Sequence, residues 1–313
     1  MRRFTSLEER IDLAAHRVLD RMPALGLSGA LVEFVVFGLK QAWACLFGGV
    51  MLALIMGTRL IWPEDALLAR YDFVFLCALA VQVAMLAFKL ETFEEAKAIF
   101  LFHLVGTAME LFKTSMGSWI YPEESFFRIA GVPLFSGFMY ASVGSYLARV
   151  ARIFDFRFTA YPPLWTTMAI AVAIYVNFFT HHFYPDMRYA ILAVTAGLFA
   201  RTWVHYRVFR FRHRMPLLVG WFLVTLFIWF AENIATWSHA WLYPAQRGLW
   251  VWVPPAKLGS WYLLMIVSFV LVTVVNRPKD MLADDEEPET EATAGGALAE
   301  AATLRKVNDI TDV

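Results

Sequence analysis

Two glutamates lie inside apolar stretches of this chain, and each begins the same short motif. Both copies read E-x3-T-x4-W-x-Y-P, the first from Glu110 to Pro122 and the second from Glu232 to Pro244, at a constant offset of 122 residues. A carboxyl group in an apolar helix costs roughly 2.5–3.5 kcal/mol on membrane-insertion scales, so it normally faces a partner or a cavity. A carboxyl that keeps its proton there can act as a general acid. Glu110 and Glu232 are therefore the candidate catalytic residues, and the alternative is a structural hydrogen bond that joins the two copies.

Each motif also carries one tryptophan and one tyrosine, which are Trp119 and Tyr121 in the first copy and Trp241 and Tyr243 in the second. Aromatic faces attract cations, so these rings could stack on a conjugated lipid or stabilise a carbocation. Tryptophan and tyrosine also collect at membrane–water interfaces, where they anchor many membrane proteins. The four rings are thus candidate substrate-binding residues, with interfacial anchoring as the alternative.

Three further polar residues accompany the glutamates. His103 and His239 lie seven residues from Glu110 and Glu232, which is two turns along one face of a helix, and Asn233 follows Glu232 directly. Asn233 has no polar counterpart in the first copy, so chemistry at the two sites would be asymmetric. These three residues join the substrate-binding candidates.

The histidines raise the question of a metal site, because imidazole and carboxylate groups together bind many transition metals. His181 and His182 are neighbours and point in different directions on a helix, and the sequence has no H-x3-H or H-x2-H-H run. It also lacks the Walker A, G-x-G-x-x-G and G-x-S-x-G patterns of nucleotide sites and ordinary serine hydrolases. The sequence therefore predicts no metal, no cofactor and no nucleic-acid partner.

The composition indicates a polytopic membrane protein. Of the 313 residues, 59% are hydrophobic and 16% aromatic, and the mean hydropathy is +0.55. A soluble chain of this length could not bury so much apolar surface. Runs with few charges predict eight spans, because a helix needs about 20 residues to cross the ~30 Å hydrocarbon layer. These runs are residues 42–61, 72–88, 98–119, 129–148, 163–180, 189–206, 216–238 and 257–276.

The offset of 122 residues extends beyond the motif, since Trp43 and Pro63 correspond to Trp165 and Pro185. Each copy would hold four spans. An even number returns the chain to its starting side, so the copies share one orientation and enclose a cavity between them. The predicted fold is an all-α integral membrane protein with eight transmembrane helices, arranged as a tandem parallel repeat of two four-helix units. The predicted domains are a cytoplasmic amphipathic segment at 1–30, repeats at 31–158 and 159–277, and a disordered acidic tail at 278–313.

Lysine and arginine set the predicted orientation. They concentrate before the first run, in alternate loops and after the last run; five arginines lie between Arg201 and Arg214 alone. By the positive-inside rule, both termini then lie in the cytoplasm of a multi-pass protein of the bacterial inner membrane. The Arg201–Arg214 segment would contact anionic membrane lipid. Assembly into a homo-oligomer is left open.

Several of these patterns resemble known families. The run Phe37-Gly38, the run Gln41-Ala42-Trp43-Ala44 and the two glutamate motifs resemble the YoaT-like group of bacterial integral membrane proteins, over residues 30–277. This resemblance implies a membrane fold and no particular activity. Residues Pro122-Glu123-Glu124-Ser125-Phe126-Phe127 are similar, more distantly, to a motif of membrane lycopene cyclases and carotenoid hydratases. The second copy lacks both acids at Pro244-Ala245-Gln246, so that resemblance implies a fold that handles polyisoprenoids rather than cyclisation itself.

Two functions are consistent with these features. The first is a cofactor-independent enzyme that acts on a polyisoprenoid or carotenoid-like lipid by acid/base proton transfer, with Glu110 or Glu232 protonating a double bond. The alternative is a transporter or lipid-binding membrane protein that uses the cavity between the two repeats. In both cases the expected partners are membrane lipid and an apolar lipid or isoprenoid ligand.

Overall fold

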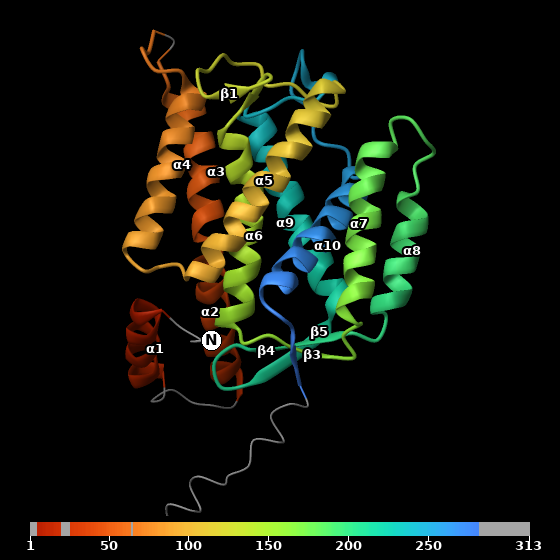
Figure 1. Ribbon diagram of the computed structural model, residues 1–313. Coiled ribbons are helices and arrows are strands. Elements are labelled where there is room, and N and C mark those ends of the chain that lie inside the picture. Colours follow the sequence, from red (N-terminus) through yellow and green to blue (C-terminus); the bar gives the residue numbers. More distant parts are fainter. Residues whose placement is uncertain (1–4, 20–25, 64, 282–313) are drawn as a thin grey trace, which may run out of the picture.

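A computed structural model describes residues 5–19, 26–63 and 65–281 of the chain, and these residues are mostly helical (Figure 1). The helices are α1 (Ser6–Leu19), α2 (Gly26–Ala44), α3 (Leu46–Ile61), α4 (Arg70–Ala87), α5 (Phe93–Ser115), α6 (Phe135–Ile153), α7 (Leu164–Thr180), α8 (Arg188–Phe199), α9 (Leu217–Trp237), a 3-10 turn η1 (Pro244–Gln246) and α10 (Lys257–Val275). The strands are β1 (Arg128–Ile129), β2 (Val132–Pro133), β3 (Arg157–Thr159), β4 (Trp203–Arg207), β5 (Arg212–Pro216) and β6 (Lys279–Asp280).

Helices α3 to α10 run side by side as a bundle with two distinct ends (Figure 1). One end carries α1 and a sheet of strand order β5-β4-β3-β6, and we call it the sheet end. The other carries the β1–β2 hairpin and the loops 116–134 and 238–256, and we call it the loop end. Helix α6 packs against α2, α3, α4, α5 and α10, and α10 packs against α5 to α9. These two helices form the centre of the bundle.

The helical surface is apolar enough for lipid contact. Four helices, α2, α4, α9 and α10, are long and apolar enough to cross a membrane. The buried share of these spans is 17% for α2, 33% for α4 and 28% for α9, so these three helices carry many exposed apolar side chains, whereas α10 is 50% buried at the centre of the bundle. Exposed apolar surface of this extent marks a membrane or partner contact. The four helices therefore indicate a membrane-associated protein.

The predicted runs overlap α3 to α10, but several boundaries differ; the run 129–148, for example, begins in the β1–β2 hairpin, and α6 begins only at Phe135. A further apolar helix, α2, precedes α3 and joins it almost continuously, because the Cys45 N–H donates to the Gln41 carbonyl and the Gly49 N–H donates to the Cys45 carbonyl. The run 189–206 is helical only as far as Phe199 and then enters β4. A short apolar run does not by itself distinguish a strand from a helix. The arginine-rich segment predicted as a loop is thus mainly the β4–β5 hairpin.

The first amphipathic helix, α1, is tied to the sheet end through one carboxylate. Glu8 accepts hydrogen bonds from Trp43 Nε1 at 2.8 Å and from Arg152 Nη2 at 3.0 Å. Arg152 in turn donates to Glu95 at 2.9 Å, so α1 is linked to both α5 and α6. The remaining parts of the predicted segment 1–30 include residues 1–4 and 20–25, which lie outside the described residues. Of the predicted tail 278–313, residues 282–313 also lie outside them.

Asp155 joins the sheet to the end of α6. Its carboxylate accepts hydrogen bonds from Arg212 of β5 at 2.7 Å and Arg157 of β3 at 3.3 Å, and lies 3.5 Å from Lys279 Nζ of β6. Burial alone would raise the pKa of Asp155. The hydrogen bond from Arg212 and the positive charges of Arg157 and Lys279 outweigh burial and lower the pKa to about 2, from an ordinary value of 3.8.

We expect the variant Asp155→Asn to unfold at a lower temperature at neutral pH, with a loss of about 1.5–3 kcal/mol, because it removes a charged acceptor from three cations. A carboxyl whose pKa is lowered on folding stabilises the protein fully above its ordinary pKa, and this contribution is lost as the pH falls through the folded value. The difference between the variant and the natural protein should therefore disappear between about pH 4 and pH 2. Thermal unfolding of both detergent-solubilised proteins across this pH range measures the difference in stability. A difference that persists at about pH 2 would contradict the assignment.

Candidate functional site

Glu110 is held by three donors near the loop end of α5. Its side chain is buried, and it accepts hydrogen bonds from Trp119 Nε1 at 2.7 Å, Tyr121 OH at 2.5 Å and Tyr140 OH at 2.7 Å. Helix α5 ends at Ser115, and Gly117 adopts a φ of 69°, which is favourable for glycine and reverses the chain. The reversal brings the tryptophan and tyrosine of the motif back onto the glutamate that precedes them.

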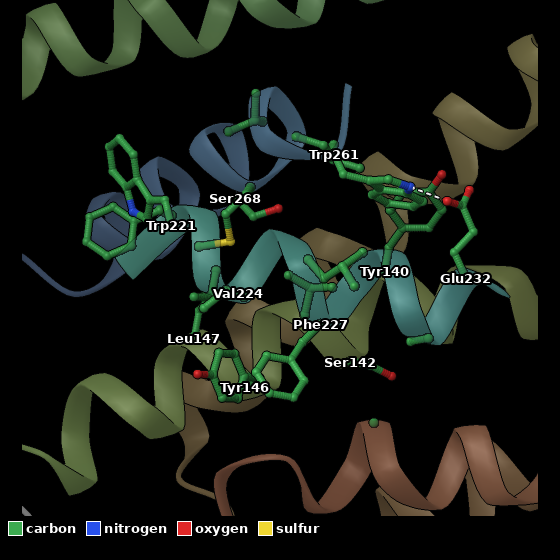
Figure 2. Close-up of a pocket in the computed structure, with 18 of the residues that line it drawn as sticks. Tyr140, Ser142, Tyr146, Leu147, Trp221, Val224, Phe227, Glu232, Trp261 and Ser268 are labelled. Carbon is green, nitrogen blue, oxygen red and sulfur yellow. Dashed lines mark hydrogen bonds between the residues drawn. The ribbon is translucent and has the colours of Figure 1, made fainter. Parts of the chain in front are cut away.

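Glu232 has a similar environment on α9, with one exchange of partner. It is buried and accepts from Tyr243 OH at 2.5 Å, as Glu110 does from Tyr121. Its second donor is Trp261 Nε1 of α10, at 2.6 Å (Figure 2). Trp241, the counterpart of Trp119 by sequence, is buried in an apolar cluster instead.

Every hydrogen bond to the two carboxyl groups comes from a phenol or an indole. A buried polar group without partners costs free energy, so these donors explain how two carboxyl groups persist in an apolar bundle. An indole N–H can only donate a hydrogen bond, whereas a tyrosine hydroxyl can also accept one. A protonated carboxyl could therefore donate to Tyr121 or Tyr243. The arrangement allows each glutamate to exist with or without its proton.

The two motifs meet at the loop end. The Ile120 N–H donates to the Leu242 carbonyl, and the Leu242 N–H donates to the Ile120 carbonyl, both at 2.9 Å. The Trp119 and Tyr243 rings lie next to this pair, edge to face, with centroids 6.1 Å apart. Segments more than a hundred residues apart in sequence are thus joined by backbone and side-chain contacts.

Both carboxylates line one cavity of about 850 Å³. Its walls come from α2, α3, α5, α6, α7, α9 and α10, and most of the lining side chains are apolar. Figure 2 shows a part of this lining: Glu232 and Trp261 lie at one end of the view, and Leu147, Val224 and Trp221 lie toward the other. The polar hydroxyls of Ser142 and Ser268 are scattered among apolar groups.

Part of the cavity lining, on the α2–α3 junction and on α9, is exposed. Five of the residues that line it are also exposed on the surface of the protein, namely Ala42, Cys45, Gly49, Leu223 and Phe227. All are small or apolar, and the Phe227 side chain is 74% exposed. This exposed part of the lining faces the apolar surroundings of the bundle rather than the loops at either end.

Five of the predicted site residues line the cavity: Glu110, Glu232, Trp119, Trp241 and Tyr243. Tyr121 lies behind Glu110 and contacts its carboxylate without reaching the cavity. The sequence interpretation missed four other lining residues, Tyr140, Trp261, Lys113 and Lys257. Tyr262 lies 122 residues after Tyr140, so the repeat offset could have identified Tyr140. Trp261 corresponds to a methionine and carries no such signal.

The remaining three candidates have structural contacts away from the cavity. Asn233 follows Glu232 by one residue, so it projects from a different side of α9, where Oδ1 accepts from the Val253 N–H at 2.9 Å. His103 packs against the Phe138 ring at a centroid distance of 5.0 Å. His239 lies beyond the end of α9 with a φ of 55°, so the two-turn spacing from Glu232 does not apply to it.

No group of three or more His, Cys, Asp or Glu residues that could hold a metal ion occurs in the described part of the chain. The Pro122-Glu123-Glu124 segment also lies away from the cavity. Glu123 binds Arg70 in a two-point ion pair, with both distances 2.7 Å, and Glu124 binds Arg128 on the surface. In this structure the two acids stabilise the loop end.

These features define a helical, membrane-associated protein with two buried carboxyl groups on an apolar internal cavity. The chain belongs to the family described as protein of unknown function DUF817, which matches residues 33–269. It is 45% identical over 251 residues to the uncharacterized protein YoaT of Bacillus subtilis (strain 168), an alignment that covers 80% of this chain and 94% of that protein. The predicted relationship to the YoaT-like group is thereby confirmed. No solved structure gives a significant match.

The two acids of the Pro-Glu-Glu segment allow a matched test. We expect Glu123→Gln to destabilise the protein by about 1.5–3 kcal/mol, because it leaves the Arg70 guanidinium, 5% exposed, without its carboxylate. Glu124→Gln removes an exposed partner and should change stability by less than about 0.5 kcal/mol. Thermal unfolding of both variants in detergent measures the difference. Equal stability of the two variants would show that the Arg70 pair does not support the loop end.

Proposed function

We propose that this protein binds a long apolar lipid in the cavity between α3, α5, α6, α9 and α10. The observation that carries the proposal is a cavity of about 850 Å³ with apolar walls, two carboxylates and an exposed apolar part of its lining. Ligand sites of this kind hold about 300–1,000 Å³ and combine apolar walls with a few placed polar groups. A lipid could enter from the membrane without crossing water.

We also propose that the membrane domain has eight spans, built as a tandem parallel repeat. Helix α6 spans 135–153 and α10 spans 257–275, so both bounds differ by 122 residues. Ile120 and Leu242 also differ by 122 residues, and they pair reciprocally. Reciprocal pairing of equivalent residues is the contact that a twofold axis between two copies produces. The axis would run along the membrane normal, as in other parallel repeats.

We further propose that the sheet end faces the cytoplasm of a bacterial cell, with the protein in the inner membrane. The sheet carries Arg157, Arg207, Arg212, Arg214 and Lys279, and such positive charge favours the cytoplasmic side. The two glutamate motifs would then lie toward the outer side.

Lipid bound to the gently purified protein tests the proposed function. Mass spectrometry of its organic extract should reveal one apolar lipid, an isoprenoid in the simplest case, enriched over the bulk membrane. The variant Gly49→Phe adds a ring at a lining position where a Cβ would meet no atom within 4 Å, so it should reduce the bound lipid severalfold without unfolding the protein.

Gly197→Phe is the matched control. Gly197 also has no atom within 4 Å of an added Cβ, and it lies on α8 outside the cavity lining. The control should keep the lipid content of the natural protein. An extract identical to bulk membrane lipid, or equal losses in both variants, would contradict binding in this cavity.

A second candidate is an enzyme that moves protons on such a lipid. The observation in its favour is the pair of short hydrogen bonds, 2.5 Å each, from Tyr121 to Glu110 and from Tyr243 to Glu232, with both glutamates on the cavity wall. Each pair could hold and release a proton beside a double bond without any cofactor.

For the enzyme, we expect Glu110→Gln or Glu232→Gln to abolish turnover of the lipid found in the extract, because glutamine cannot deliver a proton. Both variants should still fold, since the amide oxygen can accept from the indole N–H and the amide NH2 can donate to a tyrosine hydroxyl on the other side. Product formation in proteoliposomes and the unfolding temperature are measured together. Full activity in both variants would exclude the proton-transfer role and leave lipid binding as the function.

A further inference from the structure

Lys113 is a buried cation on the cavity wall without a neighbouring carboxylate. It lies on the last turn of α5, lines the cavity and is 4% exposed. Its Nζ contacts His182 Nε2 at 2.9 Å and His181 Nε2 at 3.3 Å, and lies 4.1 Å from the Phe178 ring centroid. Within the described residues, no carboxylate oxygen lies within 4.0 Å of this nitrogen. Buried charges in proteins are normally paired, so Lys113 lacks the counter-charge that its burial calls for.

Two more cations line the same end of the cavity. Lys257 begins α10, and its Nζ lies 4.3 Å from the Tyr243 ring centroid. Arg188 begins α8 and pairs with Asp186 at 2.5 Å. The positive charges of Lys257 and Arg188 and the negative charge of Asp186 all act on Lys113. Like charges held together repel, so an anion between them would stabilise this arrangement.

Among the described residues, none of the nearby carboxylates pairs directly with Lys113 or Lys257. Glu110 and Glu232 accept hydrogen bonds from tyrosine and tryptophan, and Asp186 pairs with Arg188. Glu232 attracts Lys257, but its oxygens lie beyond 4.0 Å from the ammonium group. Three basic side chains, Lys113, Lys257 and Arg188, therefore line the loop end of the cavity beside Glu110 and Glu232, and the lining toward the sheet end is mostly apolar.

We propose that the loop end of the cavity binds the anionic head group of a long-chain lipid, a phosphate or carboxylate, through Lys113, Lys257 and Arg188. The chain of the lipid occupies the apolar part of the cavity toward Trp221 and Val224 (Figure 2). It enters beside the exposed lining residues of α3 and α9. Lysine and arginine bind phosphate and carboxylate groups by charge-assisted hydrogen bonds, which are stronger in an apolar site than in water. The inference rests on the proposed lipid-binding function and specifies the chemistry of its ligand.

The test compares two ligands that differ only in the head group, farnesol and farnesyl monophosphate, on the full-length protein in detergent. Quenching of tryptophan fluorescence reports binding, because Trp119, Trp241 and Trp261 line the cavity. The monophosphate should bind about tenfold or more tightly than the alcohol, which is the effect of one charge-assisted hydrogen bond to an anion. Inorganic phosphate is added as a competitor to separate a lipid head group from a free anion.

Three charge variants locate the head group. Lys113→Gln and Lys257→Gln should each weaken the monophosphate about tenfold and weaken farnesol much less, so the preference for the monophosphate falls. Lys113→Arg keeps the charge and should retain most of the preference. Lys279→Gln, which removes an exposed lysine at the sheet end, is the matched control and should change neither affinity. Lys257 is partly exposed, so its variant provides the result even if Lys113→Gln does not fold.

The outcomes distinguish the two proposals. Equal affinity for the alcohol and the monophosphate, or an unchanged preference in both glutamine variants, overturns the anionic head group and leaves apolar lipid binding intact. Binding of neither ligand argues against the lipid-binding function itself. A further outcome is that inorganic phosphate competes with an affinity equal to that of farnesyl monophosphate. That result would support an anion site but would assign it to a free anion rather than to a lipid.

Discussion

The burial of two carboxyl groups in an apolar bundle constrains the whole loop end. Each oxygen must be hydrogen-bonded, and each donor must come from a segment that the fold brings back to the glutamate. For Glu110 the donors come from the following loop and from α6; for Glu232 they come from the following loop and from α10. The loops are therefore fixed by contacts at both ends. The backbone pairing of Ile120 with Leu242 then joins the two loops into one structure.

Close packing on one side of α6 helps to explain the cavity on the other. A Cβ on Gly106 would lie 2.5 Å from the Tyr140 ring, and a Cβ on Gly144 would lie 2.7 Å from the Phe102 ring. Small residues let two helices approach closely in a membrane protein. This approach positions the Tyr140 hydroxyl on Glu110. Helices α6 and α9 do not pack closely against each other, and both line the cavity.

The sequence alone predicted the helical architecture and the central part of the candidate site. Charge-poor runs located α3 to α10, and the repeated motif located Glu110, Glu232 and three of the rings on the cavity wall. It missed the sheet, because β3 and β6 are only three and two residues long and most of β4 lies inside a run predicted as a span. It also missed Trp261, since a donor from a neighbouring helix leaves no trace in sequence spacing.

Helix geometry explains why two of the polar candidates, His239 and Asn233, lie away from the cavity. Spacing of seven residues places two side chains on one face only while the helix continues, and α9 ends before His239. Adjacent residues on a helix point about 100° apart, so Asn233 cannot share the direction of Glu232. Lys113, three residues after Glu110, satisfies the helical rule and lies on the cavity wall. Periodicity was not sufficient even within a continuous helix, because His103 lies two turns before Glu110 on α5 and packs against Phe138 rather than on the cavity wall.

The two glutamates are equivalent in the motif but differ in how much hydrogen-bonding capacity they keep. A carboxylate offers about four acceptor positions. Glu110 uses three of them on Trp119, Tyr121 and Tyr140, whereas Glu232 uses two on Tyr243 and Trp261. The charge of Glu232 also attracts Lys257, which lines the loop end of the cavity. If one carboxylate contacts a polar group of the ligand or exchanges a proton with it, the geometry favours Glu232, while Glu110 acts mainly to hold α5, α6 and the first loop together.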